Sequence, residues 1–461
     1  MSPLSRRTLI TAGLCTGAAA ALPGPLLAEW RRSLARGGTD RPYLDAALRA
    51  ERWIRSTAID TAHGRTWPAV PGDPKRGTPE TDLYSGAPGV VLFYAALYDA
   101  TGSRTFLDEA VRGALDIAES IPTPGAAVPS AGLYEGLAGH VLVLWRVAQA
   151  SGDTKLGAAA RTGARSLAAG AHRAADGSVS WNDAYDITSG SAGIGLTLLA
   201  LRELLGDEAI DLARRSGNHL IQVSIAAGDG RRKWMANSTW PREMPNFSHG
   251  TAGIAYCLAT LSQQGGERHH LDAARDGARY LQSIAVPSGD GTVIRHHDGD
   301  GANLFYLGWC HGPAGTARLW ERLQAIDAGS EWRQAEVSGA RGLMAQGVPE
   351  RRTDGFWNNI SQCCGNAGVA EYFLTRFERT KDAADLACAR RHADDLLRRG
   401  TVDGDTERWV QAENRVAPAD VAAQTGWMQG AAGVGGMLLR LDAAMRGERQ
   451  PRAARLPDAP S

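Results

Sequence analysis

Cysteine is scarce in this chain, with 6 residues among 461, and neither sign of charge is in excess. The 50 lysine and arginine residues balance the 50 aspartate and glutamate residues. The chain therefore lacks the basic surplus that nucleic-acid binding requires, and we expect no nucleic-acid partner. Hydrophobic residues make up 43% of the sequence, which is enough at this length for a large core.

Long hydrophobic runs are also missing, and the N-terminal segment is only moderately apolar. Ser5-Arg6-Arg7-Thr8-Leu9-Ile10 resembles a twin-arginine export motif, and no charged residue occurs from Thr8 to Ala28. Pro23 and Pro25 argue against a continuous membrane helix, so we expect no transmembrane span in the mature chain. We predict a twin-arginine signal over residues 1–28, with export if it is used and a cytoplasmic location otherwise. The alternatives are a disordered tail or a misplaced start codon.

One Gly-x-x-Gly pattern recurs seven times and organises the rest of the chain. Consecutive first glycines lie 50 to 65 residues apart, at Gly86, Gly136, Gly190, Gly250, Gly312, Gly365 and Gly430. Seven copies at such a period are typical of a closed or stacked array of structural units.

Each copy is followed by a run that is apolar nearly all round, which is typical of a helix buried on most sides. Between the copies lie amphipathic runs with helical spacing, such as 43–59, 106–121, 209–225, 271–284 and 383–399. We predict an all-α toroid of seven inner and seven outer helices over residues 40–445. The proline-containing segment 446–461 is predicted to be a disordered and dispensable tail.

Three of the six cysteines fall within two copies of the repeat. They are Cys310, in Trp-Cys-His-Gly, and the adjacent Cys363 and Cys364, in Gln-Cys-Cys-Gly. Clustered thiolates favour a thiophilic metal, zinc first. An inert buried pair or a vicinal disulfide at Cys363 and Cys364 is the alternative. The isolated Cys15, Cys257 and Cys388 are interpreted as ordinary residues, Cys15 within the removed segment.

Residues just before each Gly-x-x-Gly copy should share one face of the ring. This places Asp186 and His249 near the three cysteines. Imidazole titrates near neutrality, so His249 is a candidate proton donor that Asp186 would orient. The alternatives are a helix-capping role for Asp186 and a backbone partner for His249. Loop aromatics could line a peptide groove or simply pack: Trp234, Trp240, Phe247, Phe356 and Trp357.

These motifs together resemble the lanthionine synthetase C-like family, the zinc cyclases of lanthipeptide biosynthesis and their relatives. Trp309-Cys310-His311-Gly312 looks like the family's Trp-Cys-x-Gly zinc motif, and Cys363-Cys364-Gly365 like its Cys-His-Gly motif. Asn246–Gly250 and Tyr185–Gly190 resemble the motifs that carry the active-site histidine and aspartate. The resemblance implies an α/α toroid with one zinc ion on Cys310, Cys363 and Cys364, and His249 and Asp186 as catalytic residues.

The chain departs from the family pattern at two positions. Cys364 stands where the family usually has a histidine, a three-cysteine set similar to that of one subgroup of fused lanthipeptide synthetases. The arginine that often precedes the first cysteine is replaced by Asn303-Leu304-Phe305-Tyr306. His311 matches a variable position and is not assigned to the metal.

The resemblance implies an enzyme that adds a peptide cysteine thiol to dehydroalanine or dehydrobutyrine, forming lanthionine or methyllanthionine. Its partners would be a dehydrated precursor peptide and a separate dehydratase. Two other functions stay open. One is a non-catalytic, zinc-stabilised toroid that binds peptides or other partners. The other is an α/α-toroid glycoside hydrolase, with carboxylates among Asp183, Asp186 and Glu135.

Overall fold

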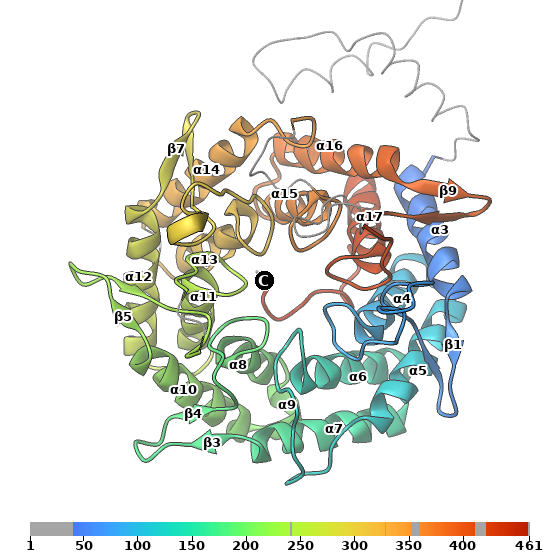
Figure 1. Ribbon diagram of the computed structural model, residues 1–461, viewed down its shortest axis with the longest axis horizontal. Coiled ribbons are helices and arrows are strands. Elements are labelled where there is room, and N and C mark those ends of the chain that lie inside the picture. The colour runs from blue at the N-terminus through green and yellow to red at the C-terminus, as the bar shows by residue number, and fades with distance from the viewer. Residues whose placement is uncertain (1–39, 240–241, 328, 352–358, 411–420, 460–461) are drawn as a thin grey trace, which may run out of the picture.

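The computed structural model describes residues 40–239, 242–327, 329–351, 359–410 and 421–459 (Figure 1). It confirms the all-α toroid of two concentric rings. The inner helices are α4 (Ala87–Thr101), α6 (Leu137–Ser151), α8 (Ser191–Ala200), α11 (Thr251–Gln263), α13 (Pro313–Ile326), α15 (Asn366–Thr380) and α17 (Ala431–Arg446). The outer helices are α3 (Pro42–Ser56), α5 (Arg104–Glu119), α7 (Thr154–Ala169), α10 (Asp207–Gln222), α12 (Arg268–Ser283), α14 (Ser330–Ala345) and α16 (Ala383–Arg399). A short helix, α9 (Arg202–Leu205), links α8 to α10. The predicted twin-arginine segment lies outside the described residues.

Burial follows the two helix patterns seen in the sequence. Inner helix α4 buries every residue from Ala87 to Leu97, as a helix flanked on all sides must. Outer helix α12 instead buries one stripe that includes Ala273, Gly277 and Leu281 and faces the inner ring. Within the described ranges, no helix combines the length and hydropathy needed to cross a bilayer.

In the described part of the chain, five short hairpins connect outer helices to the loops that follow them, and the sequence analysis did not predict these hairpins. Each is a two-stranded antiparallel pair of two or three residues per strand: β1 (Ile59–Asp60) with β2 (Arg65–Thr66), β3 (His172–Arg173) with β4 (Val179–Ser180), β5 (Ile225–Ala226) with β6 (Arg232–Lys233), β7 (Val286–Ser288) with β8 (Gly291–Val293), and β9 (Thr401–Asp403) with β10 (Thr406–Arg408). A 3₁₀ turn, η1, covers Gly299–Gly301. Strands this short carry almost no alternation signal. The predicted helical runs that ended at Ile59 and Ile225 therefore end earlier, where the hairpins begin.

The second glycine of each copy is needed because the chain folds back onto itself there. A Cβ on Gly315 would lie 1.8 Å from the carbonyl oxygen of Trp309, six residues earlier, and 2.7 Å from the Cβ of Phe247 in the preceding copy. Such contacts are far inside van der Waals distance, so no larger residue fits. The same carbonyl contact recurs at the second glycine of all seven copies.

Backbone hydrogen bonds join the seven pre-helix loops into a closed circle. In six links the residue two positions before the first glycine donates its N–H to the corresponding carbonyl of the next loop. In the remaining link the donor is shifted by one residue. The links are Tyr84 to Tyr134 (3.0 Å), Tyr134 to Thr188 (2.9 Å), Ile187 to Ser248 (3.1 Å), Ser248 to Cys310 (3.0 Å), Cys310 to Cys363 (3.0 Å), Cys363 to Met428 (3.0 Å) and Met428 to Tyr84 (2.9 Å). We call this set the loop ring. It fixes the spacing of neighbouring loops independently of their side chains.

The C-terminal segment is not the disordered tail that its composition predicts. It leaves α17 and ends near the centre of the toroid (Figure 1). Leu456 is 8% exposed and Asp458 is fully buried. The segment is ordered because arginines on the inner helices donate to it, Arg146 to the carbonyls of residues 453 and 455 and Arg318 to Asp458.

Candidate metal centre

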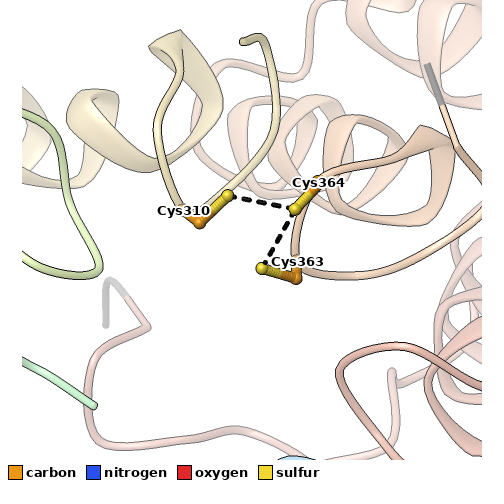
Figure 2. A group of neighbouring side chains, drawn as sticks. All are labelled: Cys310, Cys363 and Cys364. Atoms are coloured by element: carbon orange, nitrogen blue, oxygen red, sulfur yellow. Dashed lines mark hydrogen bonds between the residues drawn. The ribbon is translucent and has the colours of Figure 1, made fainter. Parts of the chain in front are cut away.

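Three cysteine sulfurs converge where the fifth and sixth loops of the loop ring meet (Figure 2). The Sγ atoms of Cys310 and Cys364 lie 3.2 Å apart, and those of Cys364 and Cys363 lie 3.3 Å apart. All three side chains are buried, and the three sulfurs lie within 4.8 Å of one another. Cys310 precedes α13 and Cys363 precedes α15, and the Cys310-to-Cys363 link of the loop ring holds the two loops together. The sequence prediction that these three residues meet is therefore correct.

The donor set fits a zinc ion. Zn–S bonds of about 2.3 Å in a tetrahedral site place sulfurs about 3.8 Å apart, so the two pairs that Cys364 makes need to spread by only about half an ångström. All three thiols are free, which rules out the vicinal disulfide between Cys363 and Cys364. Among the described residues, no fourth cysteine, histidine, aspartate or glutamate joins the group. The cluster could thus bind a metal with three protein ligands.

The surroundings shift the pKa values of Cys363 and Cys310 in opposite directions. Hydrogen bonds from the Cys310 and Cys364 thiols, with a further one from Tyr84, hold the pKa of Cys363 well below its ordinary value. Burial, followed by the neighbouring sulfurs, raises the pKa of Cys310 well above it. A lowered pKa at Cys363 favours its thiolate, the form of cysteine that binds a soft cation.

Asp186 and His249 form a hydrogen-bonded pair in the third and fourth loops. His249 Nδ1 lies 2.6 Å from Asp186 Oδ2, with the Asp186 side chain 5% exposed and the His249 side chain 32% exposed. The Asp186 carboxylate also accepts the N–H groups of Ser189 (2.9 Å) and Gly190 (3.0 Å) and the hydroxyl of Thr188 (3.1 Å). Asp186 therefore holds the turn just before α8 and fixes the imidazole of His249, while the first N–H groups of α8 itself bond to backbone carbonyls.

The protonation state of His249 follows from this pairing. Burial lowers the pKa of His249, but the hydrogen bond and charge of Asp186 raise it more, with a further contribution from Cys363, so the net shift is upward. Since Nδ1 faces the carboxylate, Nε2 remains for exchange with a substrate. The Ser248 hydroxyl donates to the Cys310 carbonyl (3.2 Å) and ties the histidine loop to the cysteine loop.

His311 belongs to an aromatic cluster rather than to the metal group. Its ring stacks on His296 with 3.8 Å between ring centroids, and Tyr306 packs edge-on against His296 at 4.4 Å. Burial and neighbouring histidines lower the pKa of His311 well below its ordinary value, so the ring is neutral. Tyr306, in the segment that lacks the family's usual arginine, thus contributes packing instead of positive charge.

Tyr84 is a site residue that the sequence analysis missed. Its hydroxyl accepts a hydrogen bond from Gln429 Nε2 (2.8 Å) and donates toward Cys363. Nothing in the sequence near Tyr84 separates it from ordinary aromatic packing. Its only signal is its position two residues before the first glycine, which Cys310 and Cys363 share.

Two of the five aromatic residues proposed for a peptide groove cannot line one, because Trp234 and Phe247 are fully buried; the Trp234 indole donates to the Leu220 carbonyl at 2.6 Å. Trp240, Phe356 and Trp357 lie outside the described residues. Of the carboxylates proposed for a hydrolase, Asp183 is exposed and Glu135 accepts the Ser189 hydroxyl.

Among solved structures, nisin cyclase shares this fold. Nisin cyclase matches with a TM-score of 0.62 at 14% identity, covering 90% of this chain and 96% of the cyclase chain. The GH76A α-1,6-mannanase of Salegentibacter sp. HEL1_6, in an inactive variant, has a TM-score of 0.47 at 11% identity over 88% and 99% of the two chains. Cellobiose 2-epimerase from Bacillus thermoamylovorans B4167 has a TM-score of 0.47 at 10% identity over 92% and 100%.

Comparison at the level of sequence is more specific. No curated protein matches the chain significantly. The family described as Lanthionine synthetase C-like protein matches residues 78–448, which include all seven Gly-x-x-Gly copies, the three clustered cysteines and the Asp186–His249 pair. The chain belongs to the lanthionine synthetase C-like family.

Proposed function

We propose that this protein is a zinc-dependent cyclase that adds a peptide cysteine thiol to dehydroalanine or dehydrobutyrine. The observation that carries the proposal is the three-sulfur cluster of Cys310, Cys363 and Cys364, with the Asp186–His249 pair in the two preceding loops of the same loop ring. Family membership and the nisin cyclase fold support it. The substrate would be a dehydrated precursor peptide, supplied by a separate dehydratase.

The three cysteines would hold the metal. Zinc bound there supplies a Lewis acid that lowers the pKa of a further bound thiol, which at its ordinary value near 8.5 is mostly protonated at neutral pH. Three protein ligands leave one tetrahedral position for that thiol. The protein's contribution is to keep its sulfurs buried and close together, which the loop ring and the Tyr84 hydroxyl both support.

His249 then serves as the proton donor. In the addition the S–H bond breaks, an S–Cβ bond forms, and the electron pair of the C=C bond moves to Cα, which takes up one proton. His249 is protonated more readily than an isolated histidine because of Asp186, and its Nε2 delivers that proton. No oxidant or reductant is needed, since the reaction is a net addition.

A non-catalytic, zinc-stabilised toroid is the second candidate. Two observations favour the cyclase. Among the described residues the cluster has three ligands, whereas structural zinc sites are closed by four. The His249 side chain is partly exposed, so a substrate can reach it. No comparable feature favours a glycoside hydrolase, since Asp186 already accepts four hydrogen bonds and lies buried.

The first experiment measures zinc per chain in reduced protein and in the variants Cys310→Ala and Cys364→Ala. Cys257→Ala is the matched control, because Cys257 is equally buried but lies on α11 away from the cluster. We expect about one zinc in the parent and in the control, and a large loss in the other two. Zinc that is absent, or that survives both cluster substitutions, would overturn the proposal.

Activity is then tested with a synthetic peptide that contains one cysteine and one dehydroalanine. Ring closure does not change the mass of the peptide, but it consumes the free cysteine thiol. An alkylating reagent adds mass only to peptides whose thiol is still free, so mass spectrometry after alkylation measures the closed fraction. His249→Gln should retain zinc but lose most of the rate over the uncatalysed background. Full zinc occupancy in a parent protein that fails to accelerate closure of this and related peptides favours the non-catalytic toroid.

A further inference from the structure

The C-terminal segment runs through the interior of the toroid toward the loop ring. Near the C-terminal end of α4, Asp99 accepts the backbone N–H groups of Arg452 and Ala453, both at 2.9 Å. Further along, Arg146 on α6 donates to the carbonyl of Ala453 at 2.6 Å. The segment therefore starts at the helix C-termini and proceeds toward the helix N-termini, where the loop ring and the cysteines lie.

The segment ends on a buried carboxylate. Asp458 is fully buried and accepts hydrogen bonds from three side chains that belong to different parts of the toroid. Arg318 on α13 donates at 2.8 Å, the Trp309 indole Nε1 donates at 3.0 Å, and the Tyr134 hydroxyl lies 3.1 Å away. The pairing with Arg318 compensates for the burial of the charge, so this contact is specific rather than incidental.

Trp309 connects this carboxylate to the metal centre. It precedes Cys310 directly, and its carbonyl oxygen packs against Gly315 at the start of α13. Its ring lies 5.0 Å from that of Tyr134 and 5.9 Å from that of Phe247, measured between centroids. The hydrogen bond from its indole to Asp458 restrains the Trp309 ring, and the Trp309 backbone continues directly into Cys310.

We propose that Asp458 is a positioning residue for the three-cysteine site and that it acts through Trp309. The C-terminal segment would thus hold the metal-binding loop from inside the toroid, much as partners behind metal ligands orient those ligands elsewhere. This inference rests on the proposed zinc site, whose own test is zinc occupancy of the parent protein.

The test measures zinc affinity by competition with a chelator, together with the visible spectrum of the cobalt-substituted protein. Asp458→Ala should weaken zinc binding about tenfold and alter the cobalt spectrum, as loss of a ligand-orienting partner does. Asp458→Asn keeps an oxygen acceptor for Trp309 and should restore most of the affinity. Trp309→Phe removes the indole donor and should weaken binding about as much as Asp458→Ala, while the double variant should be little worse than either.

Asp99→Ala is the control that separates a specific effect of Asp458 from a general loosening of the C-terminal segment. It removes an anchor of the same segment at the far end and should lower the melting temperature without changing zinc affinity. The inference is overturned if Asp458→Ala and Trp309→Phe leave zinc affinity unchanged, if their effects simply multiply, or if Asp99→Ala weakens zinc equally. Should Asp458→Ala not fold, Trp309→Phe and Asp458→Asn decide the question. A parent protein without zinc instead rejects the proposed function itself.

Discussion

A buried acid on the helix that begins beside Cys310 makes stability depend on pH. Glu321 lies on α13 with only 7% of its surface exposed, and burial raises its pKa from an ordinary 4.5 to about 7. Its ion-pair partner is Arg379, 3.5 Å away, which also lies 3.4 Å from Glu336. Arg379 is thus shared between two acids, and the Glu321 charge is under-compensated.

The sign follows from proton binding. Because the Glu321 pKa is higher in the folded than in the unfolded state, the folded protein binds more protons, and the free energy of unfolding falls as pH rises from 4.5 to about 7. Linkage gives a penalty of about 3 kcal/mol at pH 8 and under about 1 kcal/mol at pH 5. Glu321→Gln removes the charge, so its stability advantage over the parent should grow by about 2 kcal/mol between these pH values.

Thermal unfolding at pH 5 and pH 8 measures this difference. For a chain of this size, about 2 kcal/mol corresponds to about 2 °C in melting temperature. Glu331→Gln is the control, because Glu331 is exposed on the adjacent α14 and its effect should be equal at both pH values. If Glu321→Gln gains no more at pH 8 than at pH 5, the buried charge is compensated and the reasoning is wrong.

Three further predictions concern the metal centre and the N-terminal segment. Cys364→His replaces one thiolate by a neutral ligand, so the variant should bind zinc but close thioether rings more slowly, and an equal or faster rate would refute the role of the third thiolate. Asp186→Asn removes one charge-assisted hydrogen bond to His249, worth about 1.5–3 kcal/mol, so the His249 pKa should fall by about one to two units and the alkaline limb of the pH–rate profile should move to lower pH. An unmoved limb would mean that His249 is not the acid. Replacing Arg6 and Arg7 together by lysine should abolish export of the full chain, as followed by cell fractionation, and unchanged export would reject the twin-arginine signal.

The fold could be predicted from the sequence because each Gly-x-x-Gly copy marks a place where only glycine fits. A side chain at Gly315 or its equivalents would collide with the chain's own backbone, so the glycines persist at a fixed distance from each inner helix. Once seven such starts are recognised, the topology follows. The positions of Cys310, Cys363 and Cys364 within two copies then predict that their sulfurs meet, and they do.

The C-terminal segment was mispredicted because its order comes from the rest of the molecule. Its own residues are mostly polar or proline, the composition of a disordered tail. The signal lay instead on the inner helices, where Arg146 follows an apolar run on α6 and Arg318 lies among the charged residues of α13. A cation facing the interior of a ring needs an acceptor, and the segment supplies carbonyl oxygens and the Asp458 carboxylate.

The loop ring explains how one repeated framework can carry an asymmetric site. Its hydrogen bonds use backbone atoms only, so the side chain two residues before each first glycine is free to vary without loss of closure. That position carries Tyr84, Tyr134, Thr188, Ser248, Cys310, Cys363 and Met428 in turn. Tyrosines therefore serve as hydrogen-bond donors on one arc, to Cys363 and to Asp458, while cysteines gather on the opposite one. The Cys310-to-Cys363 link brings together the loops that carry two cysteines at this position, and Cys364, the residue after Cys363, completes the cluster.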